Sequence, residues 1–195
     1  MKEHILKLTS PIPPSTNHYL AYRAVVKHGK PIGMSYCTKE AKEYKESFAK
    51  YVKEEAIKQR WGLTPNPYQH FYVDAIFYFQ RFDQDSSNYY KCLLDSITDS
   101  QVIWIDDNVA CERTQGVYYD SSNPRIELTI HPVDYIGIFD NQDALDSFEQ
   151  KCKSCTRYCR NCSILNKAKE GRIQEEIADG MCAKYKEIKD YGKNK

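Results

Sequence analysis

The sequence from residue 71 to residue 82 reads Phe71-Tyr72-Val73-Asp74-Ala75-Ile76-Phe77-Tyr78-Phe79-Gln80-Arg81-Phe82. Phenylalanine, valine and alanine occupy every second position from Phe71 to Phe79, which is the period of a β-strand with one buried face. Many of the positions between them, such as Ile76 and Tyr78, are also apolar. A strand with apolar residues on both faces is typical of the centre of a sheet. We therefore expect residues 71–82 to form the central strand of the fold.

Weaker signals on either side of this segment predict one α+β domain. Prolines at positions 11, 13 and 14 stop the first apolar run, and Thr38 is a suitable N-cap for a long amphipathic helix. The turn-rich residues 120–124 predict a connection between two strands that pair antiparallel. We expect a mixed β-sheet with helices packed on it. The predicted elements are a strand at 4–9, an ordered loop at 15–23, helices at 38–59 and 87–98, and strands at 109–119 and 125–131.

The character of the sequence changes after Pro132, and we place a domain boundary near residue 138. Residues 1–138 form the predicted main domain, and residues 139–195 form a small helical extension. Within the extension, residues 141–151 are helical in composition, and four cysteines follow between residues 152 and 162. The remaining residues, 163–189, predict a charged helix interrupted at Gly171 or Gly180.

Composition limits the classes of protein that fit this chain. No segment approaches the roughly 20 consecutive apolar residues needed to span a bilayer. The apolar run at the N-terminus is also too short for a secretory signal. We therefore expect a cytoplasmic protein without a membrane partner. Its eight cysteines are then expected to be reduced or metal-bound rather than paired in disulfides.

Charges are strongly segregated along the chain, although the formal net charge is only +1. Residues 1–70 carry 12 basic and 6 acidic residues, residues 71–140 carry 4 and 12, and residues 141–195 carry 12 and 9. An acidic middle between basic flanks suits a cation site whose polyanionic ligand is held by the surrounding lysines. A solvated helix surface rich in lysine and glutamate explains the N-terminal excess about equally well.

The acidic middle contains side chains suited to metal-dependent hydrolysis of phosphodiesters. Mg²⁺ prefers one or two carboxylates together with water and substrate phosphates. Hydrolysis needs a metal to polarise the phosphoryl oxygen and activate water, and a cation to balance the developing charge. Convergence of these side chains predicts a metal-dependent nuclease, whereas the alternative is that they only cap helices and form a polar turn. The set comprises Asp83, Asp85, Asn88, Lys91, Asp95, Asp106 and Asp107.

These residues resemble the RusA-type crossover junction endodeoxyribonucleases, which resolve four-way (Holliday) DNA junctions. The resemblance covers about residues 4–131. It is carried by the approximate pattern Asp-x-Asp-Asn-x-x-Lys-x-x-x-Asp, followed by an apolar residue and a pair of aspartates. The matching segments are Pro13-Pro14-Ser15-Thr16-Asn17-His18-Tyr19, Asn88-Tyr89-Tyr90-Lys91-Cys92-Leu93-Leu94-Asp95-Ser96-Ile97, Trp104-Ile105-Asp106-Asp107 and Arg125-Ile126-Glu127-Leu128-Thr129-Ile130.

One departure from the family pattern affects the first pair of metal ligands. When the chain is aligned without a gap through Asn88 and Lys91, the first metal aspartate falls on Asp85 and the second falls on Ser87. A two-residue insertion would instead place the pair on Asp83 and Asp85. Asp85 is a candidate in both alignments.

The resemblance also implies roles for the remaining residues of the set. Lys91 takes the position of the family's catalytic lysine, and Asp107 that of its catalytic aspartate. Asp95 corresponds to a helix acid whose role stays open. The implied catalytic residues are therefore Asp85, Lys91 and Asp107, and the implied Mg²⁺ ligands are Asp83, Asp85, Asp106 and Asp107.

The resemblance further implies a homodimeric enzyme that makes paired nicks in branched DNA during recombination and repair. Two active sites related by a two-fold axis would meet the two symmetric strands of a junction. Such enzymes are often carried by prophages. A loop that is merely stiffened by prolines and packed on the sheet explains the N-terminal segment equally well. The residues expected to approach DNA are Asn17, His18, Tyr19, Arg23 and Asn88.

A second motif, Cys-x₂-Cys-x₃-Cys-x₂-Cys, consists of Cys152, Cys155, Cys159 and Cys162. Two such pairs in a cytosolic protein predict a tetrahedral thiolate site, most often structural Zn²⁺. The short spacer leaves open an iron–sulfur centre, a site of three of these cysteines plus another ligand, or four free thiols. The family core lacks this extension, so the resemblance implies nothing about it. Cys182 has no predicted partner.

Two other functions stay open from the sequence. Ser87 at the position of a carboxylate favours a DNA- or protein-binding adaptor with a weakened catalytic site, in which the cysteine cluster is the working part. If the cysteines form a redox sensor, the purified protein should be coloured or contain iron, whereas a zinc site would give neither property.

Overall fold

The computed structural model describes residues 4–158 and 160–188 of the chain. Its backbone divides into two compact units, Met1–Val133 and Asp134–Lys195. The sequence places the boundary five residues later, near residue 138. Each unit is described by itself below.

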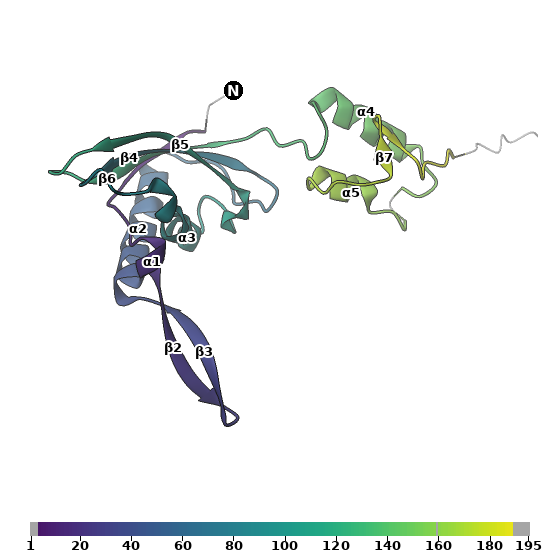
Figure 1. Cartoon of the computed structure of the whole chain (residues 1–195). Helices are drawn as coiled ribbons and strands as arrows, with labels where there is room; N and C mark the ends of the chain where they lie inside the picture. Colours follow the sequence, from purple (N-terminus) through teal and green to yellow (C-terminus); the bar gives the residue numbers. More distant parts are fainter. Residues whose placement is uncertain (1–3, 159, 189–195) are drawn as a thin grey trace, which may run out of the picture. The chain divides into compact units, whose positions relative to one another are not determined.

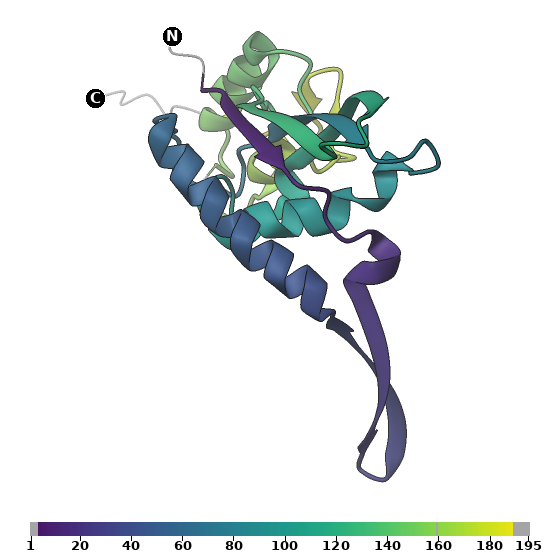
Figure 2. The same cartoon turned by 90° about the vertical axis from the view of Figure 1, so that its left-hand side faces the viewer.

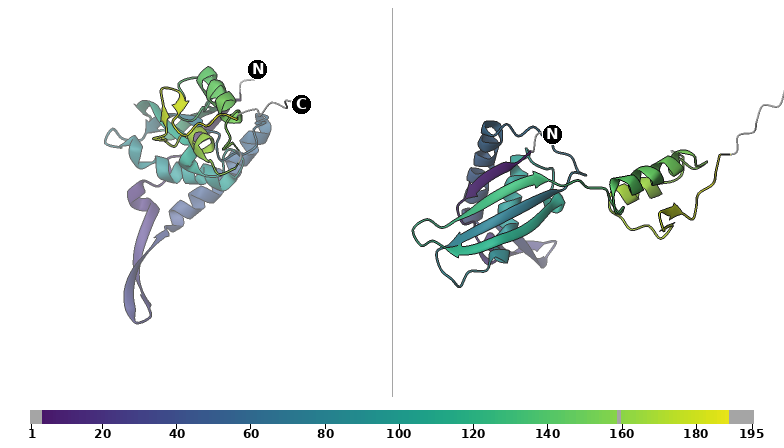
Figure 3. Two further views of the ribbon diagram at one scale, coloured as in Figure 1. Left: turned by 90° about the vertical axis from the view of Figure 1, so that its right-hand side faces the viewer. Right: turned by 90° about the horizontal axis from the view of Figure 1, so that it is seen from above.

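The N-terminal unit is built on a four-stranded sheet with the order β1-β6-β4-β5 (Figure 1). Its strands are β1 (Leu6–Ser10), β6 (Arg125–Pro132), β4 (Phe71–Phe79) and β5 (Ala110–Tyr119). Strand β6 pairs antiparallel with both β1 and β4, whereas β4 and β5 are parallel. The sheet is therefore mixed, and the expected α+β class is confirmed. Figure 3 shows the strands side by side from above.

Strand β4 occupies the interior of the sheet, as its apolar pattern predicts. The residues at every second position from Phe71 to Phe79 are buried, and those between them are half-buried. The expected antiparallel pairing of residues 109–119 with residues 125–131 is wrong, because β4 lies between β5 and β6. The turn-rich residues 120–124 instead pass over the end of β4, where the backbone N–H of Asp120 donates to the carbonyl of Phe79 (2.8 Å). Placing β4 between two strands pairs both of its backbone edges, which the sequence of the turn could not indicate.

Two helices pack on one face of the sheet (Figure 2). The first is α2 (Lys39–Lys58), which Thr38 caps as predicted by accepting a hydrogen bond from the backbone N–H of Ala41. The second is α3 (Tyr90–Ser100), which connects the parallel strands β4 and β5. Parallel neighbours require such a crossover connection. The hydrophobic core joins the inner faces of α2 and α3 to the buried side of the sheet.

The segment expected to be an ordered loop at 15–23 is regular structure. Residues Thr16–Tyr19 form the short helix α1, and a two-stranded hairpin follows with β2 (Leu20–Lys27) and β3 (Lys30–Cys37). His28 and Gly29 form its turn with φ of 53° and 73°, the conformation of a two-residue hairpin turn. The hairpin extends away from the sheet and helices (Figure 1), and most of its residues are exposed.

Over residues 134–158 and 160–188, the C-terminal unit contains two helices and a very short hairpin. Helix α4 (Gln142–Lys153) begins after Asn141, close to the predicted helix, and α5 (Ile164–Lys169) ends after six residues. The charged helix expected over residues 163–189 is wrong beyond that point. Strands β7 (Ile177–Ala178) and β8 (Met181–Cys182) pair antiparallel across a turn. Left-handed φ values at Gly171 (78°) and at Gly180 (70°) are incompatible with a continuous helix.

Two further expectations concern the whole chain. Among the described residues, no helix is both long enough and apolar enough to cross a membrane. The seven cysteines whose positions are described are free thiols.

Candidate active site

The connection from β4 to α3 places the candidate lysine. Asp85 caps the single-turn 3₁₀-helix η1 (Ser86–Asn88), with Oδ1 accepting a hydrogen bond from the backbone N–H of Ser87 (3.0 Å). Two buried tyrosines then anchor the start of α3. Tyr89 packs on Phe79 with ring centroids 5.2 Å apart, and the hydroxyl of Tyr90 hydrogen-bonds that of Thr114 (2.8 Å). Lys91 follows directly on the exposed side of the helix.

Lys91 bridges two carboxylates that come from different elements. Its Nζ lies 2.8 Å from Oδ1 of Asp95, one turn further along α3, and 3.2 Å from Oδ2 of Asp107. The hydrogen bond to Asp95 is the main cause that raises the pKa of Lys91, and the bond to Asp107 adds to it. The lysine is therefore held as a cation at neutral pH.

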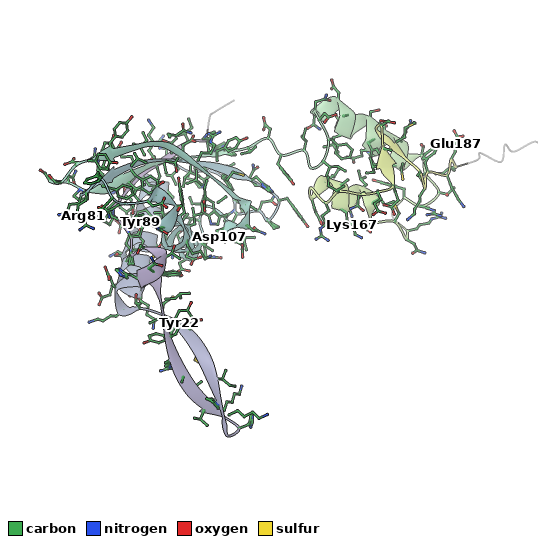
Figure 4. All side chains as sticks on the ribbon, in the orientation of Figure 1. Tyr22, Arg81, Tyr89, Asp107, Lys167 and Glu187 are labelled. Carbon is green, nitrogen blue, oxygen red and sulfur yellow. The ribbon has the colours of Figure 1, made fainter. Side chains whose placement is uncertain are left out.

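The segment between α3 and β5 positions Asp107. Ile103 and Trp104 are fully buried, and the indole Nε1 of Trp104 donates to Oγ1 of Thr98 (2.7 Å). Asp106 then caps the 3₁₀-helix η2 (Asp107–Val109) by accepting from the backbone N–H of Asn108 (3.0 Å). This anchored turn places Asp107 on the helix side of the sheet (Figure 4).

A buried tyrosine supports the opposite side of Asp95. The hydroxyl of Tyr19 donates to Oδ2 of Asp95 (2.5 Å). Burial, followed by this hydrogen bond, raises the pKa of Tyr19, which keeps the hydroxyl protonated as a donor. The same N-terminal segment is tied to η1, because Oγ1 of Thr16 donates to the carbonyl of Asn88 (2.9 Å). Tyr19, Asp95, Lys91 and Asp107 thus form one continuous chain of hydrogen bonds.

Glu112 adds a further carboxyl group near this chain. It lies on β5, and although much of the residue is exposed, loss of hydration around its carboxyl group raises its pKa. The neighbouring charge of Asp107 raises that pKa further, whereas Lys91 lowers it. Glu112 therefore shares the electrostatic environment of Asp107 and Lys91.

Of the predicted catalytic residues, the structure brings Lys91 and Asp107 into direct contact. The described contacts of the other predicted ligands are local. Asp83 forms an ion pair with Arg81 (3.2 Å), and Asp85 and Asp106 cap their own short helices. Carboxylates match the donor preference of Mg²⁺. Within residues 4–158 and 160–188, however, no group of three or more His, Cys, Asp or Glu side chains is arranged to hold a metal ion.

The residues expected to approach DNA fall into two groups. Asn17, His18 and Arg23 are exposed, and Asn88 is half-buried. Tyr19 differs, because only 6% of the residue is exposed and its hydroxyl is engaged with Asp95. Its position suits support of Asp95 better than contact with a ligand.

The cysteine motif begins at the end of α4. Cys152 lies in the last turn of that helix, Cys155 follows in the next turn, and Cys162 precedes α5. Cys159, the remaining predicted ligand, lies outside the described residues.

Sequence reasoning left Asp95 without a role and did not single out Glu112. The spacing of four residues between Lys91 and Asp95 was a visible signal for their ion pair. The contact between Tyr19 and Asp95 joins positions 76 residues apart, and no local pattern indicates it.

Comparison with known protein families gives one match that covers most of the chain. The family model described as endodeoxyribonuclease RusA matches residues 11–131. These residues include α1, the hairpin, the whole chain of hydrogen bonds from Tyr19 to Asp107, and all but the last residue of β6. A comparison with curated proteins gives no match.

Proposed function

The chain belongs to the RusA family of endodeoxyribonucleases, and on that premise we propose that it cleaves phosphodiester bonds in branched DNA, four-way junctions above all, with Mg²⁺ as cofactor. The observation that carries this proposal is the contact of Lys91 with Asp95 and Asp107. It joins a cation to two carboxylates inside the segment that the family model matches. We propose that the enzyme acts in DNA recombination and repair.

Asp85 and Asp107 are the carboxylates that we propose to hold Mg²⁺, assisted by Asp83 and Asp106. Their hard oxygen donors fit this ion, which usually binds through one or two carboxylates, water and substrate phosphates. When bound, Mg²⁺ would polarise the phosphoryl group and lower the pKa of the attacking water. Asp83 and Asp85 are both exposed. To reach the ion, Asp83 would exchange its ion pair with Arg81 and Asp85 its capping hydrogen bond for contacts with the metal.

Lys91 is the residue that we propose to stabilise the charge developing on the scissile phosphate. Its pKa is raised mainly by Asp95, so it stays protonated during catalysis at neutral pH. Asp95 and Tyr19 fix the direction of the ammonium group through their hydrogen bonds. A cation held in place beforehand stabilises a transition state without the cost of reorganising at the moment of reaction.

The β2–β3 hairpin is the element that we propose to bind the DNA arms, together with Asn17, His18 and Asn88. Residues 20–37 contain no acidic residue, and their basic side chains include Arg23 and Lys27. Tyr22 is 78% exposed and lies near the base of the hairpin (Figure 4). Basic groups provide the salt-dependent contacts to phosphates, and exposed aromatic rings can stack on unpaired bases.

We also propose that two copies of the chain act together. A four-way junction presents two symmetric strands, and a homodimer presents two active sites related by the same symmetry. The mass of the protein in solution, alone and with a junction, tests this proposal.

For the C-terminal unit we propose a structural metal bound by the cysteine cluster. The spacing of Cys152, Cys155, Cys159 and Cys162 supports Zn²⁺, with an iron–sulfur centre as the alternative. The unit would then be stabilised by metal binding rather than take part in cleavage.

A nicking assay on a synthetic four-way junction tests the proposed activity. We expect paired nicks at symmetric positions that require Mg²⁺ and disappear when the metal is chelated. Linear duplex DNA of the same sequence is the control and should stay uncut. Tight binding of the junction without cleavage at any Mg²⁺ concentration would contradict the proposal and favour the alternative of a DNA-binding adaptor.

A further inference from the structure

We propose that Cys182 is a metal ligand, and that Cys152, Cys155, Cys162 and Cys182 together bind one Zn²⁺ ion. These residues are called the four-cysteine set below. The proposal revises the cysteine site, because Cys182, 20 residues beyond the 152–162 motif, takes the place of Cys159 as the fourth ligand. It rests on the proposal of a structural metal in this unit but not on the nuclease activity. A set of four cysteines matches the usual tetrahedral coordination of structural zinc.

All members of the four-cysteine set line one cavity of about 150 Å³ in the C-terminal unit. They reach it from four separate points of the fold: the last turn of α4, the turn after it, the residue before the cap of α5, and the end of β8. Burial raises the pKa of Cys152 to about 11, and the Cys182, Cys162 and Cys155 thiols add to this shift. The thiol of Cys152 therefore has the other three as electrostatic neighbours.

Basic side chains surround this cavity. Arg157, Lys169 and Lys184 are part of its lining. Four thiolates and one Zn²⁺ carry a net charge of minus two, and cations at the edge of such a site offset that charge. Two of these cations also have carboxylate partners, because Lys169 pairs with Glu149, which lines the cavity too, and Lys184 pairs with Glu176.

Backbone hydrogen bonds before and after Cys182 in the sequence hold it beside the 152–162 motif. The turn at Asp179 and Gly180, both with left-handed φ, leads into β8 and places Cys182 opposite Ile177. After β8, residues 186–188 pair with residues 154–156 through two backbone hydrogen bonds of 2.8 and 3.0 Å. In the same stretch the backbone N–H of Lys186 donates to Sγ of Cys155 (3.5 Å). Hydrogen bonds of this kind orient metal ligands and tune their basicity.

The C-terminal unit has little apolar core of its own. Among its described residues, the buried apolar side chains are Phe148, Ile164 and Ala168. A domain of this small size is marginal without disulfides, a metal or a partner. A metal that joins α4, α5 and β8 would supply this missing stabilisation, because metal binding free energy then contributes to folding.

Binding requires the sulfur atoms to move inward from the walls of the cavity. As the described residues stand, no three metal-ligating side chains are grouped closely enough to hold an ion. Cys155 and Cys162 lie in turns or at element ends, where small shifts of the backbone are least costly.

Zinc content of the purified full-length chain tests the proposal. We expect elemental analysis to find about one zinc per parent chain. Cys159→Ser should keep this zinc content, whereas Cys182→Ser should lose most of its zinc. Cys111→Ser, on β5 in the other unit, is the matched control and should keep its zinc. Cys182→His should retain zinc, because an imidazole nitrogen can replace a thiolate. Its cobalt-substituted form should show altered absorption bands, since one sulfur ligand has been exchanged for nitrogen.

Three results would overturn the proposal. The first is a Cys182→Ser protein with parental zinc content, and the second is a parent chain that takes up no zinc even when refolded with an excess. The third is iron with visible absorbance in place of zinc. If Cys182→Ser keeps its zinc while Cys159→Ser loses it, the 152–162 motif alone forms the site. Junction cleavage by the same preparations reports separately on the nuclease activity.

Discussion

Replacing Lys91 by methionine separates a catalytic role of its ammonium group from a structural one. The Nζ atom lies 2.8 Å from Asp95 and 3.2 Å from Asp107, and 56% of the side chain is exposed. Ion pairs this accessible to water contribute roughly 0.2–1 kcal/mol each. Methionine retains most of the apolar stem of the lysine. We therefore expect the free energy of unfolding to fall by only about 1 kcal/mol.

Catalysis should change by much more than stability. Removing one group that stabilises charge in a transition state lowers the rate by roughly 10²–10³, which corresponds to about 3–4 kcal/mol. The rate of junction cleavage under single-turnover conditions and the unfolding of the same protein in urea measure the two effects side by side. Such a loss of rate, in a protein that remains almost fully folded, assigns Lys91 to the chemistry.

Lys58→Met is the matched control for this experiment. Lys58 is 63% exposed and pairs with Glu55 at 2.8 Å on α2, so its replacement removes a similar surface ion pair away from the candidate site. Its cleavage rate should equal that of the parent. The reasoning is refuted if Lys91→Met cleaves at the parental rate, or if Lys58→Met loses activity to the same extent.

Further predictions concern the support of the site, the pH dependence of the protein's stability and the hairpin. Tyr19→Phe removes the buried donor to Asp95. Because a lost hydrogen bond typically costs about 1 kcal/mol, cleavage should slow about tenfold while the affinity for the junction stays unchanged. A weaker affinity with the parental cleavage rate would contradict this role. Asp74 has its pKa lowered to about 2, mainly by its hydrogen bond to the guanidinium of Arg113, so its stabilisation is present above pH ~4 and is lost as the pH falls toward ~2. Asp74→Asn should therefore cost about 1 kcal/mol after allowance for solvent screening at neutral pH and clearly less near pH 2, where the carboxyl group is about half protonated. An equal loss at both pH values in denaturant titrations would refute this cause. Replacing Arg23 and Lys27 together by alanine should weaken junction binding and reduce its salt dependence by about two counterions; an unchanged salt slope in binding titrations would exclude the hairpin from the phosphate contacts.

Local patterns in the sequence predicted several elements of the fold correctly. Thr38 lies at the start of α2 because its side chain can satisfy a free backbone N–H, which is a property of the residue itself. The alternation from Phe71 to Phe79 predicted both the strand and its interior position. In each case the signal is local: the cap contacts a backbone N–H a few residues away, and the strand shows a repeating pattern of buried side chains.

Other parts of the fold depend on contacts that local patterns do not contain. Strand β5 pairs with β4 rather than with β6 because β4 lies in the interior of the sheet and hydrogen-bonds to a strand on each of its two edges. The hairpin was missed because Pro31 and Gly33 count against a strand, although the turn at His28 and Gly29 is a hairpin signal. The expected C-terminal helix ends at Lys169, two residues before Gly171, whose left-handed φ of 78° forms a turn rather than a kink within a longer helix.

The candidate site was predictable in its residue types but only partly in its geometry. Lys91 and Asp95 lie four residues apart on one helix, so their ion pair follows from helical geometry. The approach of Asp107 depends on how Trp104 is buried, and the contact of Tyr19 depends on the fold of a distant segment. Cys182 is separated by 20 residues from the cysteine motif, and its place in the same cavity becomes visible only when the chain is folded.

The most direct test of the central claim is Mg²⁺-dependent cleavage of a four-way junction by Asp107→Asn. This substitution keeps the size of the side chain and removes the charge that faces Lys91. We expect cleavage to be abolished while the dissociation constant for the junction stays near that of the parent, and we expect Asp99→Asn, whose carboxylate pairs with Lys45 (3.0 Å), to cleave normally. Junctions cut by Asp107→Asn as fast as by the parent would show that catalysis occurs elsewhere in the chain.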